Sequence, residues 1–164
     1  MNIISKRFGK VSFEEDAVIN FPHGIIGFPE AKKYILLGQG ESGVVGWLQS
    51  VDAPEIALPV ASAHAFPAPY PDVPLTDAML AAGMEAPGEN VAVLAVIIAT
   101  PAQEPTVNLL APIVIDADTR QGAQVILQGS RFSTRELLVF RAELKPAAPV
   151  SHDSAPRLRS AADA

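Results

Sequence analysis

Short apolar runs recur along most of the chain and are separated by turns that contain proline or glycine. Runs of this length that are rich in valine, isoleucine and aromatic residues are typical of β-strands. The predicted strands span residues 3–8, 11–13, 17–21, 34–37, 45–51, 56–62, 91–100, 106–115, 124–127 and 137–140. The 15 prolines and 11 glycines favour such short strands over long helices.

Local signals add one helix and several turns. Residues 76–82 form the clearest helical segment, with Thr76 as a plausible N-cap and Gly83 as the left-handed residue after its end. Residues 29–33 can form a single helical turn, because Pro29 suits a first helical position. Turns at residues 9–10 and 116–122 predict two hairpins.

Two strands carry additional information about their place in a sheet. Residues 91–100 are apolar on both faces, which predicts a strand inside the protein. Pro59 lacks a backbone N–H and therefore restricts strand 56–62 to an edge or a bulge. Many closely spaced strands with one short helix indicate an all-β fold, and we expect a small closed or partly open antiparallel β-barrel.

The chain length fits one domain and a short tail. With 164 residues and 49% hydrophobic content, the chain is long enough for a substantial core. We expect a β-barrel domain over residues 1–145. Residues 146–164 have no apolar periodicity and several prolines, which predicts a disordered C-terminal tail.

Charge and cysteine content narrow the class of function. A net charge of −6, with basic pairs only at residues 6–7 and 32–33, argues against direct nucleic-acid binding. No apolar run is long enough for a membrane span, and the N-terminal residues are too polar for a signal peptide. The absence of cysteine suits a cytoplasmic location.

The segment Gly-Gln-Gly-Glu-Ser-Gly at residues 38–43 has the spacing of a dinucleotide-binding loop. Such a loop must open a helix whose N-terminus binds the pyrophosphate, followed about 20 residues later by an acidic ribose ligand. Residues 44–51 are instead β-like, and Glu55 is a poor candidate for that ligand. We therefore expect a connection between two strands, and no cofactor.

The remaining polar residues predict neither a metal site nor a catalytic set. His23, His64 and His152 are scattered and lack the i+3 or i+4 spacing of a helical metal site. Asp116 and Asp118 suit a hairpin turn, and residues 14–16 suit a solvated acidic turn. Ser42 does not lie in a nucleophile-elbow sequence. We expect a protein that is not an enzyme.

Four segments resemble, in order, those of the flagellar assembly factor (FliW) family. Residues 21–28, Phe-Pro-His-Gly-Ile-Ile-Gly-Phe, are similar to its F-P-x-G-I-x-G-F segment, and residues 47–50 match its W-L-Q-S. Residues 108–115 are similar to its N-L-x-A-P-I-V-I, and residues 122–127 follow. The resemblance covers residues 1 to about 135. The chain departs from the pattern in its alanine- and proline-rich segment after Pro59 and in its continuation past Arg135.

The resemblance implies a cytoplasmic regulator that is not an enzyme and has two protein partners. Members bind newly made flagellin and, once flagellin has been exported, bind the RNA-binding translational repressor CsrA. Capture of the repressor frees flagellin messenger RNA for translation. An acidic protein suits a basic RNA-binding partner through electrostatic steering. We expect a monomer that binds neither nucleic acid nor membrane directly.

The same segments supply the candidate residues for partner binding. These candidates are Phe21, Pro22, Gly24, Phe28, Trp47, Gln49, Asn108 and Gln124. The large aromatic candidates also suit a core, and Gly24 also suits a special backbone geometry. The polar candidates at 49, 108 and 124 can face solvent, satisfy buried backbone groups or contact a partner, and the sequence leaves these alternatives open.

Two other functions remain as alternatives. A small-molecule-binding β-barrel would need a sizeable interior pocket with converging polar groups. An oligonucleotide-binding barrel would need a basic and aromatic face, which this sequence lacks.

Overall fold

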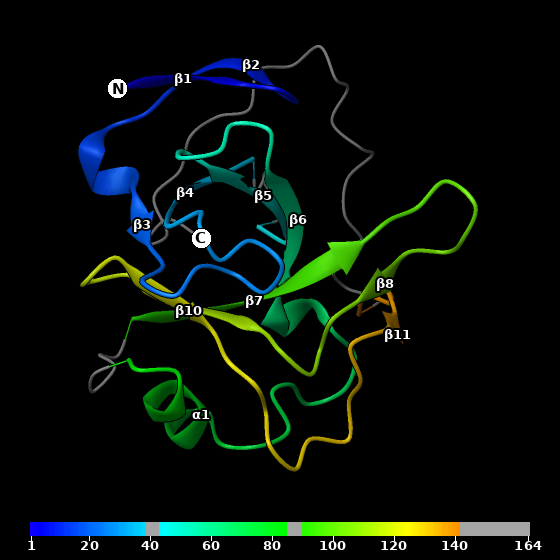
Figure 1. The fold of residues 1–164 in the computed structure, drawn as a ribbon. Helices are drawn as coiled ribbons and strands as arrows, with labels where there is room; N and C mark the ends of the chain where they lie inside the picture. The colour runs from blue at the N-terminus through cyan, green and yellow to red at the C-terminus, as the bar shows by residue number, and fades with distance from the viewer. Residues whose placement is uncertain (39–42, 85–89, 142–164) are drawn as a thin grey trace.

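The computed structural model describes residues 1–38, 43–84 and 90–141, and these form a β-barrel with one short α-helix on its outside (Figure 1). The strands are β1 (Asn2–Ser5), β2 (Gly9–Ser12), β3 (Ile19–Asn20), β4 (Lys33–Leu37), β5 (Val45–Ser50), β6 (Ala57–Ser62), β7 (Val91–Ile98), β8 (Thr106–Val107), β9 (Ile113–Asp116), β10 (Gln121–Gln124) and β11 (Glu136–Leu137). The helix is α1 (Leu75–Ala81), and two 3₁₀ turns are η1 (Glu15–Ala17) and η2 (Ala63–Ala65). The expected fold class is confirmed.

The barrel closes through a pairing between strands that are distant along the sheet. The sheet order runs β7-β6-β5-β4-β3-β10-β9, and β9 pairs back onto β7, from Val91↔Asp116 to Leu94↔Ile113. Neighbours in this ring are antiparallel except β3 and β10, which are parallel and pair at Gln121↔Asn20. Closure leaves these strands without a long exposed edge.

Bulky side chains fill the barrel interior. One core cluster combines Phe21, Tyr34 and Leu48 with residues from the other walls, and all three are fully buried. A second cluster lies between the barrel and the β1–β2 hairpin, which packs Val11 and Phe13 against β4. A third lies between the outer face of β10 and α1. The interior is therefore packed with side chains, as in other small barrels.

The structure corrects several predicted boundaries at the N-terminal half. The first turn lies at residues 6–8 rather than 9–10, because the Ser5 hydroxyl accepts hydrogen bonds from the N–H groups of Arg7 and Phe8. Residues 29–33 form no helical turn. Instead the Asp52 carboxylate accepts bonds from the N–H groups of Lys32 and Lys33, where β4 begins.

Pro59 lies in an interior strand, since β6 has β5 on one side and β7 on the other. The prediction of an edge strand was wrong for β6 as a whole. Pro59 nevertheless pairs only with Trp47 of β5, because the β6–β7 pairing begins at Val60. The missing N–H therefore falls where β6 has one neighbour.

The helix begins one residue earlier than predicted. Pro74 is the N-cap of α1 and makes no side-chain capping bond, so the prediction of Thr76 as the cap was wrong. The predicted C-terminal end is confirmed: Gly83 has φ +85°. The Gly83 N–H bonds to the Leu80 carbonyl and the Met84 N–H to the Met79 carbonyl, which is the Schellman arrangement.

The predicted strand 106–115 is two strands. β8 pairs with the end of β7 and β9 with its start, and residues 108–112 lie between them. The Asn108 side chain accepts a bond from the Ala111 N–H, and Pro112 cannot donate to a ladder, so the run is interrupted. The hairpin from β9 is confirmed, but its second strand is 121–124 rather than 124–127.

Candidate functional site

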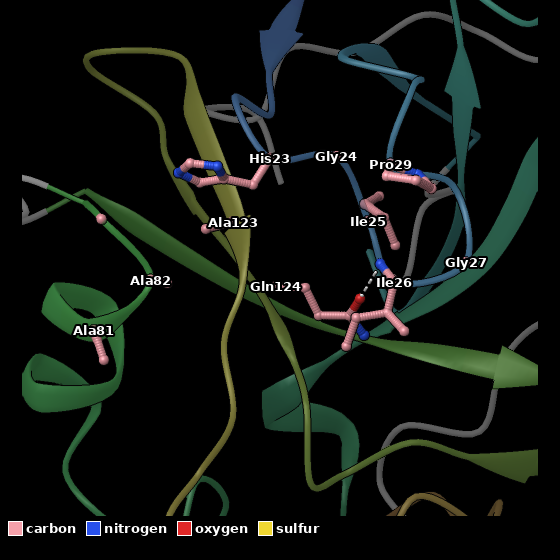
Figure 2. A pocket seen from close by; sticks show the side chains of 11 residues that line it. His23, Gly24, Ile25, Ile26, Gly27, Pro29, Ala81, Ala82, Ala123 and Gln124 are labelled. Atoms are coloured by element: carbon pink, nitrogen blue, oxygen red, sulfur yellow. Dashed lines mark hydrogen bonds between the residues drawn. The ribbon is translucent and has the colours of Figure 1, made fainter.

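A groove crosses the outer face of β10 between α1 and the loop at residues 22–29 (Figure 2). Its central hollow measures about 550 Å³. The floor is formed by Ala123 and Gln124, one wall by residues 81–83 at the end of α1, and the other wall by residues 23–29. We call this hollow and the two that adjoin it the β10 groove, which is lined by residues 22–27, 29, 73–74, 77–78, 81–84, 116, 119, 121–126 and 128.

Two further hollows of about 490 Å³ extend the groove in both directions. Ala82 lines all three hollows, so they are neighbours along one trough. His23 separates the central hollow from the one beside Asp116, and its Nε2 lies 3.4 Å from where a Cβ on Gly83 would be. Asp77 lines the opposite hollow along α1.

The loop of the β10 groove takes its shape from one glycine and local backbone bonds. Gly24 has φ +67°, and a Cβ there would lie 2.6 Å from the Phe28 carbonyl oxygen, so a larger residue does not fit. The Phe28 N–H bonds to the Ile25 carbonyl at 2.7 Å. These constraints hold residues 24–28 in a compact turn and expose Ile26 on the groove wall.

Phe21 anchors the loop from inside the barrel. Its ring is fully buried and lies edge-to-face on Tyr34 with the centroids 5.2 Å apart. A Cβ on Gly122 would lie 2.5 Å from Phe21 Cζ, so the ring occupies the space that a side chain on β10 would need. The first family-like segment is therefore locked to the last one through the core.

Gln124 connects three segments around the groove. Its Oε1 accepts a hydrogen bond from the Ile26 N–H at 2.8 Å, and its Nε2 donates to the Ala111 carbonyl at 3.0 Å. Both ends of the amide are thus used to satisfy backbone groups. This side chain therefore bonds backbone groups of two other segments, the exposed Ile26 N–H and the part-buried Ala111 carbonyl.

Gln49 and Asn108 lie away from the β10 groove. Gln49 is fully buried, accepts a bond from the Ser5 hydroxyl and donates to the carbonyls of Ser50, Pro54 and Ile56. The amide of Asn108 shapes the turn before β9. Both side chains therefore satisfy groups of the fold, and Gln49 has no surface to offer a partner.

Trp47 also lies elsewhere, beside the β1–β2 hairpin. Its half-buried ring contacts Phe8 edge-to-face at 5.5 Å, and the Arg7 guanidinium lies 4.4 Å above it. Phe28 is half-buried against the barrel core. Of the eight candidates, only Pro22, Gly24 and Gln124 line the β10 groove, with Phe21 beneath it.

Among the described residues, the ionisable lining of the three hollows consists of His23, Asp77 and Asp116, with no lysine or arginine. The buried Asp116 carboxylate accepts bonds from the N–H groups of Asp118 and Thr119, which is the turn role expected for this residue. One carboxylate thus lies toward each end of the β10 groove: Asp77 is exposed, whereas Asp116 is buried and bonded within its own turn.

Hydrogen bonds of Tyr70 and Asp72 fix the segment that precedes α1. The Tyr70 hydroxyl donates to the Leu109 carbonyl, and burial, followed by the nearby Asp72 charge, raises the pKa of Tyr70. Burial alone would raise the pKa of Asp72. Its hydrogen bonds from Ser130 and Arg131 and the Arg131 charge outweigh that effect, so the pKa is lowered. These contacts hold the wall of the groove formed by Val73 and Pro74.

Three other sequence features can be placed. Residues 38–43 connect β4 to β5, and strand follows Gly43 where a dinucleotide loop needs a helix; residues 39–42 lie outside the described part. Among residues 1–38, 43–84 and 90–141, no three His, Asp or Glu side chains lie together as a metal site. No helix in these ranges is long and apolar enough to cross a membrane.

Comparison with known proteins identifies the family. A model of the FliW protein family matches residues 2–138, which includes the barrel, α1 and the whole β10 groove. The chain belongs to the FliW family. The expected resemblance is therefore confirmed, and the four segments that carried it lie within the matched region.

Individual members of the FliW family align with this chain over most of their length. The "Flagellar assembly factor FliW" of Lachnoclostridium phytofermentans is 35% identical over 136 residues, covering 80% of this chain and 86% of the relative. That of Geobacter sulfurreducens is 36% identical over 138 residues, covering 82% and 84%. A crystal structure of a flagellar assembly factor FliW superposes with a TM-score of 0.70 and 28% identity, covering 84% of this chain and 96% of that one.

Most of the groove lining in this FliW-family chain has no functional signal in the sequence. His23 lacks a partner at metal-ligand spacing, and residues 81–82 and Asp77 belong to no functional motif. Small residues after a short helix carry no functional signal by themselves. The Gly83 helix end and the Pro22-His23-Gly24 turn were the available signals, but nothing in the sequence indicates that they meet.

Proposed function

We propose that this protein is a flagellar assembly regulator that binds flagellin and antagonises the translational repressor CsrA by direct protein–protein interaction. Antagonism of CsrA frees flagellin messenger RNA for translation, so filament assembly controls flagellin synthesis. The observation that carries the proposal is the FliW family match over residues 2–138, together with relatives named flagellar assembly factors. In this proposal the protein acts in the cytoplasm, as a monomer, and by binding rather than catalysis.

The charge of the chain supports a basic partner. The net charge is −6, and the described lining of the β10 groove contains two carboxylates and no lysine or arginine. An RNA-binding repressor needs clustered basic residues to contact phosphates, so the two surfaces are electrostatically complementary. Complementary charge mainly increases the association rate and makes binding sensitive to salt.

The interior of the barrel disfavours the small-molecule alternative. The lumen is filled by fully buried residues such as Phe21, Leu48 and Ile113, whereas a small-molecule site needs a sizeable interior pocket. The open hollows lie outside the barrel wall, over β10. This arrangement supports a macromolecular partner.

A calorimetric competition tests the proposal. CsrA is titrated into the protein alone and into the protein saturated with flagellin monomer. We expect flagellin to weaken CsrA binding, and linkage requires CsrA to weaken flagellin binding by the same factor. We also expect CsrA binding to weaken as salt is raised. Equal CsrA affinity with and without flagellin would contradict the switch even if each partner binds tightly.

A further inference from the structure

The turn between β1 and β2 carries positive charge on a protein that is negative overall. Lys6, Arg7 and Lys10 are all exposed, and residues 1–13 contain no aspartate or glutamate. The net charge of the whole chain is −6, so the rest of the chain is more acidic still. The hairpin forms a two-stranded sheet of its own on the outside of the barrel (Figure 1). We call residues 6–10 the cationic turn.

A buried chain of hydrogen bonds fixes the backbone of the cationic turn. Gln49 of β5 is fully buried, and its side-chain oxygen accepts a bond from the Ser5 hydroxyl at 2.7 Å. The Ser5 oxygen in turn accepts bonds from the N–H groups of Arg7 and Phe8 at 3.1 and 3.0 Å. The conformation of the turn is therefore set by the core of the barrel, and little ordering is left for a partner to impose.

The Trp47 ring holds the Arg7 side chain in place. The Arg7 Cζ lies 4.4 Å from the ring centroid, and Phe8 contacts the same ring edge-to-face at 5.5 Å. A guanidinium that stacks on an aromatic face can still donate hydrogen bonds from its edge to a carboxylate or phosphate. Trp47 and Gln49 both belong to the Trp-Leu-Gln-Ser segment at residues 47–50, so this segment supports the cationic turn from two directions.

The acidic residues beside the cationic turn do not neutralise Arg7. The Lys6 N–H bonds to the Pro54 carbonyl, so the loop that contains Asp52 and Glu55 lies next to the turn. The Asp52 carboxylate is used by the backbone N–H groups of residues 32–33, and Glu55 is exposed. Within the described residues, Arg7 forms no ion pair with a carboxylate. Its hydrogen-bonding edge is thus available to an anionic ligand.

The charges select an acidic protein segment over a nucleic acid. A nucleic acid carries a phosphate at each nucleotide and is held by many lysine and arginine contacts, whereas the cationic turn offers three basic side chains. A chain with a net charge of −6 also repels a long polyanion. A short segment with two or three carboxylates complements the turn without bringing further negative charge close to the acidic remainder.

We propose that the cationic turn binds a short acidic segment of a protein partner. One carboxylate of that segment accepts two hydrogen bonds from the Arg7 guanidinium above Trp47, and its neighbours lie against Lys6 and Lys10. This inference goes beyond the proposed function. The basic, RNA-binding surface of CsrA is repelled by this turn, so the turn serves a contact other than the capture of that surface.

Two synthetic hexapeptides of glycine and serine test the site in the full-length protein. One carries two central glutamates and the other two central glutamines. We expect the glutamate peptide to cause saturable chemical-shift changes at the amides of residues 5–10 and at the indole N–H of Trp47. The glutamine peptide should bind about tenfold more weakly, as for the loss of two exposed ion pairs. Binding of the glutamate peptide should also weaken as salt is raised.

Variants separate the cationic turn from charge elsewhere on the protein. Arg7→Gln should weaken binding of the glutamate peptide by about three- to tenfold, and Arg7→Lys by less, because lysine keeps the charge but lacks the two-pronged donor. Lys10→Gln leaves the stacking on Trp47 intact and should weaken binding about twofold. The matched control is Arg135→Gln, the same change at an exposed arginine just before β11, far from the hairpin in Figure 1, which should leave the affinity unchanged.

The outcomes decide both the site and the class of partner. Equal binding of the two peptides, shift changes confined to other surfaces, or wild-type affinity in both Arg7→Gln and Lys10→Gln would overturn the inference. A thymidine trinucleotide, with two phosphates in place of two carboxylates, should bind more weakly than the glutamate peptide at the same salt concentration. Tighter binding would assign the turn to nucleic acid and overturn the acidic-segment assignment. These measurements use neither CsrA nor flagellin, so their failure leaves the proposed function standing.

Discussion

Gln49 and Tyr34 are both fully buried polar residues, and they differ in how their hydrogen-bonding groups are satisfied. Both ends of the Gln49 amide are used, by the Ser5 hydroxyl and by three backbone carbonyls. The Tyr34 hydroxyl has no partner within the described chain. A buried polar group without a partner destabilises the fold, whereas a satisfied one helps to specify it.

Replacing Tyr34 by phenylalanine should therefore stabilise the protein. We expect the free energy of unfolding in urea to rise by about 1 kcal/mol, because the unpaired hydroxyl no longer has to be desolvated. Tyr70→Phe is the matched control: its hydroxyl donates to the Leu109 carbonyl, so its loss should cost about 1 kcal/mol. If Tyr34→Phe destabilised the protein as much as the control, the hydroxyl would have a partner in solution.

The same substitution should alter the response to alkaline pH. Burial, followed by the nearby Asp52 charge, raises the pKa of Tyr34 from 10.0 to about 12. The unfolded chain therefore ionises first as pH rises, and the stability associated with the neutral hydroxyl is lost between these two values. Urea unfolding across that window should show the gap between Tyr34→Phe and wild type widening, and a constant gap would contradict the raised pKa.

At the scale of elements, β10 is the strand on which the site depends. Its inner face receives the Phe21 ring at Gly122, and its outer face carries Ala123, which packs with the following Val125 beneath α1. The Gln124 side chain joins it to the 22–29 loop and to the segment before β9. One short strand thus positions both walls of the β10 groove.

Gly122→Ala should disrupt this arrangement. A Cβ would lie 2.5 Å from the Phe21 ring, so we expect a loss of about 1–3 kcal/mol from overpacking. Phe21→Leu should relieve the clash, so the double variant should lose less than the sum of the two single losses. Urea unfolding of all four proteins gives this coupling energy, and simple additivity would show that the two side chains do not meet.

The hydrogen bonds from Ser130 and Arg131 to the Asp72 carboxylate, just before α1, are sensitive to acid. The lowered pKa of Asp72 reflects its bonds from Ser130 and Arg131, so the ionised form stabilises the fold. That contribution is present above the ordinary value of 3.8 and is lost as pH falls through the lowered pKa. Asp72→Asn should therefore reduce thermal stability at neutral pH but make little difference in strong acid. A deficit that is the same at both pH values would contradict this role.

At the scale of the whole molecule, the chain after the barrel packs back onto it. Phe132 contacts Tyr70 edge-to-face at 5.4 Å, and Phe140 stacks on Phe66 at 6.1 Å. The Arg141 N–H bonds to the Ala65 carbonyl at 2.8 Å. The described part of this continuation, which the sequence suggested as a departure from the family, is therefore part of the packed structure.

Two truncations should separate the packed continuation from the tail. A chain ending at Lys145 keeps all these contacts, and we expect its melting temperature to equal that of the full chain. A chain ending at Arg131 loses Phe132, Leu138 and Phe140, and should lose about 3 kcal/mol of apolar burial. Residues 146–164, predicted to be a disordered tail, lie outside the described residues. A loss above about 1 kcal/mol in the longer chain would contradict that prediction.

The sequence by itself determined the fold class, the family and the elements with strong local signals. The strands predicted at residues 34–37, 45–51 and 91–100 begin and end within two residues of the observed strands β4, β5 and β7. Gly83 correctly marked the end of the helix, because a left-handed residue after a helix favours glycine locally. Apolar runs and glycine positions report on their immediate neighbours, and this information is present in any short window of sequence.

Only the tertiary structure decided how these elements close and where a partner has room to bind. The run at 106–115 divides because β7 offers it two separate pairing sites, and the pairing of β7 with β9 closes the barrel. The β10 groove joins residues 22–27, 81–84 and 121–126, which are far apart along the chain. Strand partners and hollows depend on contacts between distant segments, and a local pattern of apolar and polar residues does not specify which distant segments meet.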